Sequence, residues 1–178
     1  MKSVLASIQP RWCEKIACGD KTDEIRKNAP KIPVPFKCYI YQTKMMWSYP
    51  ILRYLGRLDL LEKLDRGKGK VIGEFLCDAI NPVTVDNEKR LAQTSCVTLR
   101  EMWEYAKPKS LFDLKSWHIS GLTMYENPKP LSMFHKVGYI STKQSVFGWT
   151  MEEEKSWQIN KPPQSWCYVE EEQYGSLE

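Results

Sequence analysis

The sequence predicts an α+β protein built as a small mixed β-barrel with peripheral helices. Segments with the pattern of strands outnumber those with the pattern of helices, and long irregular connections join most of them. The chain lacks the regular helical crossovers that a doubly wound parallel sheet requires. Its 178 residues suit one domain, and the 42% of hydrophobic residues excludes a wholly disordered chain.

The chain is expected to open with a strand, a short helix and a second extended segment. Residues 3–8 combine apolar and β-branched side chains, as strands do. Pro10 stands where a helix accepts proline in its first turn, and Gly19 stands where a helix ends. We therefore expect a helix between them, followed by an extended segment over 21–26.

The middle of the chain contains two further strands around a helical insertion. Aromatic and β-branched residues predict a strand at 36–41. Over 45–64, leucine and isoleucine recur at helical spacing, which predicts the insertion. A strand at 70–77 follows, and its Gly73 is expected to mark a bulge or a close approach of another backbone.

A second helix has a clear start signal, because Thr98 and Glu101 have the spacing of a capping box. The polar stretch before it is expected to be an irregular connection. Strands are predicted at 117–125 and 165–169, whereas 138–157 is only weakly patterned.

The net charge of +4 conceals an uneven distribution. Residues 1–70 carry 15 Lys and Arg against 7 Asp and Glu, whereas the remaining residues carry 11 against 15. The basic first part indicates a surface that meets an anion. A solvated surface without a partner explains the same distribution.

Cysteine usage and hydropathy indicate the class of protein. The six cysteines include no C-x-x-C pair, and the chain has only two histidines, so the sequence does not favour a zinc site. No run approaches the roughly 18 apolar residues of a membrane span, and an early proline interrupts the first segment before it could form a signal peptide. We therefore expect a soluble cytoplasmic protein with no disulfide, metal, cofactor or membrane partner.

The extended segment at 21–26 contains most of the candidate functional residues. Side chains alternate between two faces of a strand, so Thr22, Glu24 and Arg26 are expected to share one face. Lys21 directly follows the turn at Gly19 and can swing towards them. Such a cluster offers a cation for a phosphate and a carboxylate for a base edge or a proton transfer, and its structural alternative is a plain ion pair.

The spacing of this segment resembles a family signature. The pattern G-x-K-x-x-E-x-R is that of the ASCH domain family, and it is formed here by Gly19, Lys21, Glu24 and Arg26. Three further segments are similar to family members carried by bacterial and phage genomes, namely 7–12, 70–75 and 161–169.

The resemblance implies a PUA-like β-barrel in which the motif lines a ligand cleft. It predicts one ASCH domain over 1–169 with insertions at 45–68 and 82–115. An acidic tail over 170–178 is expected to be disordered.

The first functional hypothesis follows from this resemblance, since members of the family are proposed to bind RNA or nucleotides. Lys21 would contact a phosphate or a polarised carbonyl, while Glu24 accepts a base amino group and Arg26 fixes that glutamate. Thr22 lies within the motif, and Tyr41 is the best candidate for stacking on a base. The tryptophans are expected to belong mainly to the core.

The second hypothesis is a hydrolase, because the family includes ribonucleases and amidohydrolases that act on acylated cytidine nucleosides. The resemblance implies Lys21 as the base and Glu74, on a later strand, as the supporting glutamate. The nucleophilic threonine of the amidohydrolase branch is replaced here by Glu24, and Thr22 is a hydroxyl near it in the sequence.

The third hypothesis is a non-catalytic module that binds a protein partner. The helical insertion at 45–64 would supply the contact surface, whereas its packing in the core is the plain structural alternative. The sequence leaves the oligomeric state open.

Overall fold

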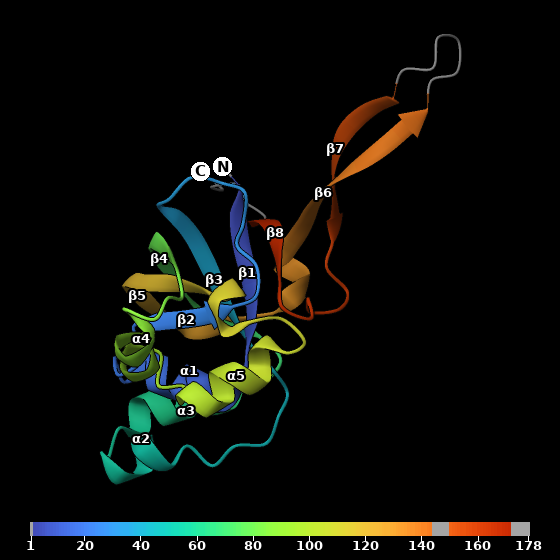
Figure 1. Ribbon diagram of the computed structural model, residues 1–178. Coiled ribbons are helices and arrows are strands. Elements are labelled where there is room, and N and C mark those ends of the chain that lie inside the picture. The colour runs from blue at the N-terminus through green and yellow to red at the C-terminus, as the bar shows by residue number, and fades with distance from the viewer. Residues whose placement is uncertain (1, 144–149, 172–178) are drawn as a thin grey trace.

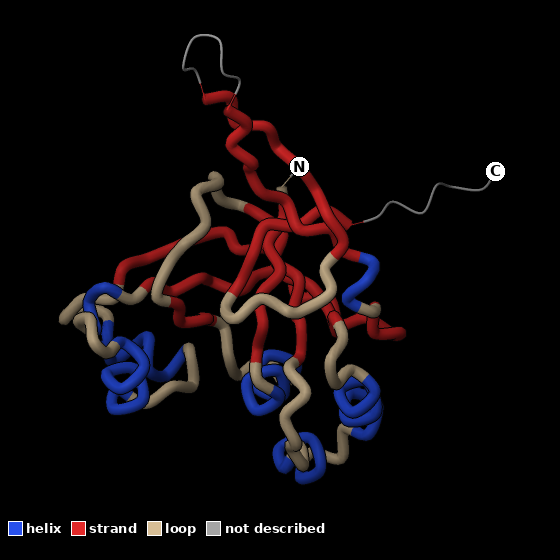
Figure 2. Tube along the Cα trace, turned by 90° about the vertical axis from the view of Figure 1, so that its right-hand side faces the viewer, coloured by secondary structure: helices blue, strands red, loops and turns tan. Residues whose placement is uncertain are grey.

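The strands form one mixed sheet of eight, with the α-helices gathered along one side of it (Figures 1 and 2). The computed structural model describes residues 2–143 and 150–171. The strand order is β2-β5-β4-β3-β1-β8-β6-β7. The predicted α+β class is confirmed. In the described residues the sheet is open, because its end strands β2 and β7 each pair with one neighbour only.

The elements have the following bounds. The strands are β1 Ser3–Ile8, β2 Asp23–Arg26, β3 Phe36–Gln42, β4 Val71–Pro82, β5 Lys115–Lys129, β6 Phe134–Lys143, β7 Thr150–Gln158 and β8 Trp166–Glu171. The α-helices are α1 Pro10–Ala17, α2 Pro50–Tyr54, α3 Leu58–Arg66, α4 Glu88–Thr94 and α5 Leu99–Ala106. Two single 3-10 turns lie at Leu111–Asp113 and Leu131–Met133.

Strand β1 lies in the interior of the sheet and is buried on both faces. It runs parallel to β3 and antiparallel to β8. Val4 and Ala6 pack in the larger core, which also contains Trp117, whereas Leu5 packs in a second cluster with Tyr39. The end of β1 is therefore a rigid edge for whatever lies beside it.

The prediction for Gly73 is confirmed. Strand β4 pairs with β5, and the register shifts on both sides of this residue. A Cβ atom at Gly73 would lie 2.4 Å from the carbonyl oxygen of Thr123. Only a glycine lets the two backbones come this close.

The helices agree with the sequence except at α4 and in the insertion expected at 45–64, where 45–49 are not helical and the remainder forms the two short helices α2 and α3. The predicted capping box is present, since Thr98 Oγ1 accepts from the backbone N–H of Glu101 and the Glu101 carboxylate accepts from that of Thr98. The stretch expected to be an irregular connection contains α4. This helix has seven residues and buries Leu91 alone, so it has no apolar periodicity to detect.

The weakly patterned stretch at 138–157 contributes to a hairpin. Strands β6 and β7 pair antiparallel, and the hairpin extends away from the rest of the sheet (Figure 1). Strands that leave the core have few apolar partners, which explains the weak pattern. Of the predicted acidic tail, Glu170 and Glu171 belong to β8, and 172–178 lie outside the described residues.

Five of the six cysteines pack in or against the apolar clusters, whereas the Cys96 thiol donates to Asp20 O. All six are free thiols, and burial raises the pKa of Cys13 and of Cys38. A buried thiol that stays protonated is a poor nucleophile. Across the part of the chain that the structure describes, no helix is both long and apolar enough to cross a membrane.

Candidate ligand-binding cavity

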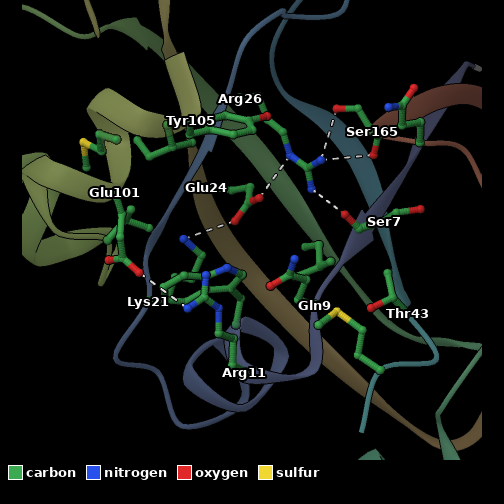
Figure 3. Close-up of a pocket in the computed structure, with 17 residues that line it drawn as sticks. Ser7, Gln9, Arg11, Lys21, Glu24, Arg26, Thr43, Glu101, Tyr105 and Ser165 are labelled. Atoms are coloured by element: carbon green, nitrogen blue, oxygen red, sulfur yellow. Dashed lines mark hydrogen bonds and ion pairs between the residues drawn. The ribbon is translucent and has the colours of Figure 1, made fainter. Parts of the chain in front are cut away.

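A cavity of about 360 Å³ opens beside the end of β1, between the start of α1, strand β2 and helix α5 (Figure 3). Lys21, Glu24 and Arg26 are the buried charged residues of its lining, and we call the part of the lining that they form the floor. The segments after β3 and before β8 complete the lining. The volume is in the range of sites for small ligands.

The turn after α1 places Lys21 at this cavity. Gly19 has a φ of +83°, a left-handed conformation that glycine adopts without strain. The backbone N–H groups of Gly19 and Lys21 donate to carbonyls in the last turn of α1 at 3.0 and 3.1 Å. The chain then enters β2, where Glu24 lies opposite Trp117 of β5.

Glu24 lies between two cations. Its Oε2 is 3.1 Å from Lys21 Nζ, and its Oε1 is 3.0 Å from Arg26 Nε. The three residues are 2–7% exposed. Burial raises the pKa of Glu24, but the charges of Lys21 and Arg26 outweigh this effect and hold the pKa below its ordinary value. The floor therefore carries an ionised carboxylate.

The ammonium of Lys21 has two further acceptors. It donates to Asp23 O at 2.8 Å and to Ser95 O at 2.7 Å. Together with Glu24, these acceptors match the three N–H groups of an ammonium. Lys21 thus ties β2 to the turn between α4 and α5, which helps to place α5 beside the cavity.

The guanidinium of Arg26 connects β2 to distant parts of the sheet. Its Nη2 donates to Ser7 O of β1 at 2.9 Å, and its Nη1 lies 3.1 Å from Ser165 O and 3.2 Å from Ser165 Oγ, just before β8. Strand β1 is four places from β2 in the strand order. The sheet therefore curls so that β2 comes close to β1. Arg26 links these two strands at a place where no backbone ladder between them is described.

The walls combine aromatic rings with a cation at the rim. The Arg11 guanidinium carbon lies 4.2 Å from the centroid of Trp12, and its Nη1 is 3.4 Å from Glu101 Oε1. Tyr105 of α5 lines the cavity as well. About 42% of the Arg11 side chain and 40% of the Glu101 side chain are exposed, so the rim presents this ion pair to solvent.

Three solved structures share this architecture. No family model matches the sequence. No curated protein matches it. The similar structures are crystal structures of an ASCH protein from Zymomonas mobilis, two of them of single-substitution variants, tyrosine to phenylalanine and serine to alanine. Their TM-scores are 0.50–0.52 at 14–15% identity, covering 94–96% of this chain and 87–91% of theirs. The chain has the ASCH fold.

Within this ASCH fold, three predicted site residues lie outside the cavity, and two of them, Thr22 and Glu74, have their contacts elsewhere. Thr22 is held by its backbone, which donates to Thr94 O and accepts from Ile119 N, each at 2.8 Å. Glu74 lies 2.8 Å from Lys37 Nζ and accepts from the hydroxyl of Tyr125, and it does not line the cavity. The structure thus brings Lys21, Glu24 and Arg26 together without Thr22 or Glu74.

Tyr41 lies outside this cavity, in the lining of a neighbouring one. It is 3% exposed and lines a second cavity of about 450 Å³ beside the first. Sequence reasoning missed Arg11 and Tyr105 as lining residues. Arg11 lies in the 7–12 segment that resembles the family and could have been found there, whereas Tyr105 lies in an insertion and carried no signal.

The lowered pKa of Glu24 predicts acid sensitivity. A carboxyl group whose pKa is lower in the folded than in the unfolded state stabilises the fold above its unfolded pKa of about 4.3, and this contribution is lost as the pH falls through the folded value. Urea unfolding of the wild type and of Glu24→Gln from pH 6 to pH 3 should show a gap in stability that narrows with falling pH. A gap that stays constant contradicts the prediction.

Proposed function

We propose that this ASCH-fold protein binds RNA or a nucleotide, with a base in the cavity above Glu24. The observation that carries the proposal is the ionised, 7% exposed Glu24 at the floor of a cavity large enough for a nucleoside. A fixed carboxylate accepts hydrogen bonds and donates none, so it selects a ligand edge with an N–H group. The amino groups of cytosine, adenine and guanine are such edges.

The other groups suit the remaining parts of a nucleotide. Trp12 and Tyr105 offer aromatic faces, and stacking on such faces contributes roughly 1–3 kcal/mol per base. Arg11 at the rim offers a cation to a phosphate. We also propose that the protein is cytoplasmic, as expected from the sequence.

In this proposal Lys21 has a different role from the phosphate or carbonyl contact expected from the sequence. Its three N–H groups already have acceptors, so it supports Glu24 as a fixed counter-ion rather than contacting a phosphate. The same saturation opposes the hydrolase hypothesis, in which Lys21 acts as a base and must first lose one of these protons. The position of Glu74 outside the cavity adds to this argument.

Ligand analogues give the sharpest test. Binding of 5′-CMP, 5′-AMP, 5′-GMP and a short single-stranded RNA is measured by calorimetry at low and moderate salt. The tightest of the three mononucleotides is then compared with an analogue that lacks only the exocyclic amino group: the monophosphate of zebularine for CMP, of purine riboside for AMP or of inosine for GMP. The analogue should bind about tenfold more weakly, as expected for the loss of one hydrogen bond to a charged group.

Variants at the rim complete the test without disturbing the floor. Arg11→Gln should weaken binding and make it less dependent on salt. Arg100→Gln is the matched control, because Arg100 is exposed on the neighbouring helix and does not line the cavity. Absence of binding by every nucleotide and RNA at low salt, or equal affinity for the two members of the analogue pair, refutes the proposal.

A protein partner at the 45–64 insertion is the second candidate. Its support is that five large apolar side chains stand exposed there, of which Met46 at 85%, Tyr54 at 90% and Leu58 at 68% are the most exposed. Light scattering of the purified chain tests self-association at this surface. A dimer that Leu58→Ser dissociates supports it, and a monomer at all concentrations excludes self-association.

A further inference from the structure

The floor of the cavity presents acceptors to a ligand, because its donors are already engaged. The ammonium of Lys21 has three acceptors within the chain. Each nitrogen of the Arg26 guanidinium lies within 3.1 Å of an oxygen of the chain. Each carboxylate oxygen of Glu24 has one cation beside it and two lone pairs, so one lone pair on each is left for a ligand (Figure 3).

Two neighbouring acceptors match a base edge that carries two neighbouring N–H groups. Guanine is the standard base with such an edge, formed by N1–H and the N2 amino group. In cytosine and adenine a ring nitrogen with a lone pair adjoins the amino group, and in uracil a carbonyl lies on each side of N3–H. Such an edge sets a lone pair against a carboxylate oxygen, which is repulsive.

We propose that the cavity selects guanine, with N1–H and N2–H donating to the two carboxylate oxygens of Glu24. This inference rests on the proposed function and narrows its ligand to guanine nucleotides and to RNA that presents an unpaired guanine. A guanidinium group also carries two neighbouring N–H groups. The floor opposes it, because two buried cations and one buried anion already give a net charge of +1.

Guanine also has an acceptor beside N1–H, the carbonyl oxygen O6, and Gln9 can donate to it. Gln9 lines the cavity at the end of β1, two positions after Ser7, whose carbonyl accepts from Arg26. The Gln9 carbonyl accepts from the backbone N–H groups of Trp12 and Cys13 at 2.9 and 3.0 Å, which fixes its backbone at the start of α1. Its side chain makes no capping bond, and within the described chain its amide has no other partner. The amide is therefore available to the ligand.

Ligand analogues test the role of Glu24 while the floor stays intact. Calorimetry should find 5′-GMP bound about tenfold more tightly than CMP, AMP or UMP. Inosine monophosphate, which lacks the N2 amino group, and 1-methyl-GMP, in which N1–H is blocked, should each bind about tenfold more weakly than GMP or worse. The matched ligand is 7-deaza-GMP, which is altered on the opposite edge and should bind within about twofold of GMP.

A variant tests the role of Gln9. Gln9→Met should weaken GMP binding about fivefold, as expected for one neutral hydrogen bond, and should change the affinity for 6-thio-GMP less than about twofold, because sulfur is a weak acceptor. Gln93→Met is the control, since Gln93 is exposed on α4 and lines neither cavity. An equal effect of Gln9→Met on both ligands overturns the contact with O6.

The outcomes separate this inference from the proposed function. CMP, AMP or UMP bound as tightly as GMP, or equal affinities for GMP and 1-methyl-GMP, overturn guanine selection, and nucleotide binding then still upholds the proposed function. Agmatine is the guanidinium probe, and its binding in preference to GMP overturns the selection as well. Absence of all nucleotide and RNA binding overturns both.

Discussion

Replacing Glu24 with glutamine is expected to lower the free energy of unfolding by about 3–5 kcal/mol. Glu24 is the anion between the buried side chains of Lys21 and Arg26. The amide that replaces it carries no charge and turns an N–H group towards one of the two cations. Both cations then stay buried without a counter-ion, which is far more costly than losing an exposed ion pair.

Urea denaturation measures this loss, and the chain offers a matched control. Glu104 and Lys107 have the same i, i+3 spacing as Lys21 and Glu24, with 2.9 Å between charges, but their side chains are 62% and 65% exposed. Glu104→Gln should cost less than about 1 kcal/mol. Adding Lys21→Met to Glu24→Gln should recover part of the loss, because it removes one unpaired cation. A Glu24→Gln protein as stable as Glu104→Gln contradicts this account.

The second large effect is expected at Arg26. Arg26→Met should also cost about 3–5 kcal/mol, because it removes one partner of the buried Glu24 pair and the Arg26 donor to Ser7 O. Ser165 O loses one of its two donors and keeps the other, the backbone N–H of Ser7. Arg26→Lys should recover less than half of this loss. An ammonium is a compact charge and cannot reproduce the planar fork that reaches three separate segments.

Fluorescence-monitored urea unfolding and amide hydrogen exchange measure the effect at Arg26. Exchange should accelerate most at β2, since Arg26 is its link to β1. Arg66→Met is the control, because Arg66 is exposed on α3 and its Nε lies 3.7 Å from Glu62. Full stability of Arg26→Lys, or protection of β2 that does not change in Arg26→Met, contradicts the role assigned to the guanidinium.

Local signals explain why much of the fold was predictable. Proline and glycine delimit α1, and the capping box of Thr98 and Glu101 marks the start of α5. The apolar or aromatic strands lie close to their predicted bounds. Helix α4 was not predictable, because a short helix that buries one leucine leaves no periodic trace. The α+β class therefore followed from the sequence, whereas the open end of the sheet depends on pairing between distant strands.

The candidate site was predictable only as far as neighbours in sequence form it. Alternation along one short strand was enough to place Glu24 beside Arg26. Glu74 faces Lys37 and Tyr125 instead, because the position of its strand in the sheet decides its surroundings. The contact of Lys21 with Ser95 spans 74 residues, and no local pattern encodes such a distance.

For the ligand binding proposed above, the curl of the sheet restricts how the ligand preference of this cavity can change. Glu24 and Arg26 would recognise the ligand and also secure β2 to β1, so a substitution there alters selectivity and foldedness together. Gln9, Arg11 and Gln164 line the cavity without such a bond to the strands among the described contacts. Divergence to new ligands, in nature or by directed evolution, should therefore accumulate at the rim and spare the floor.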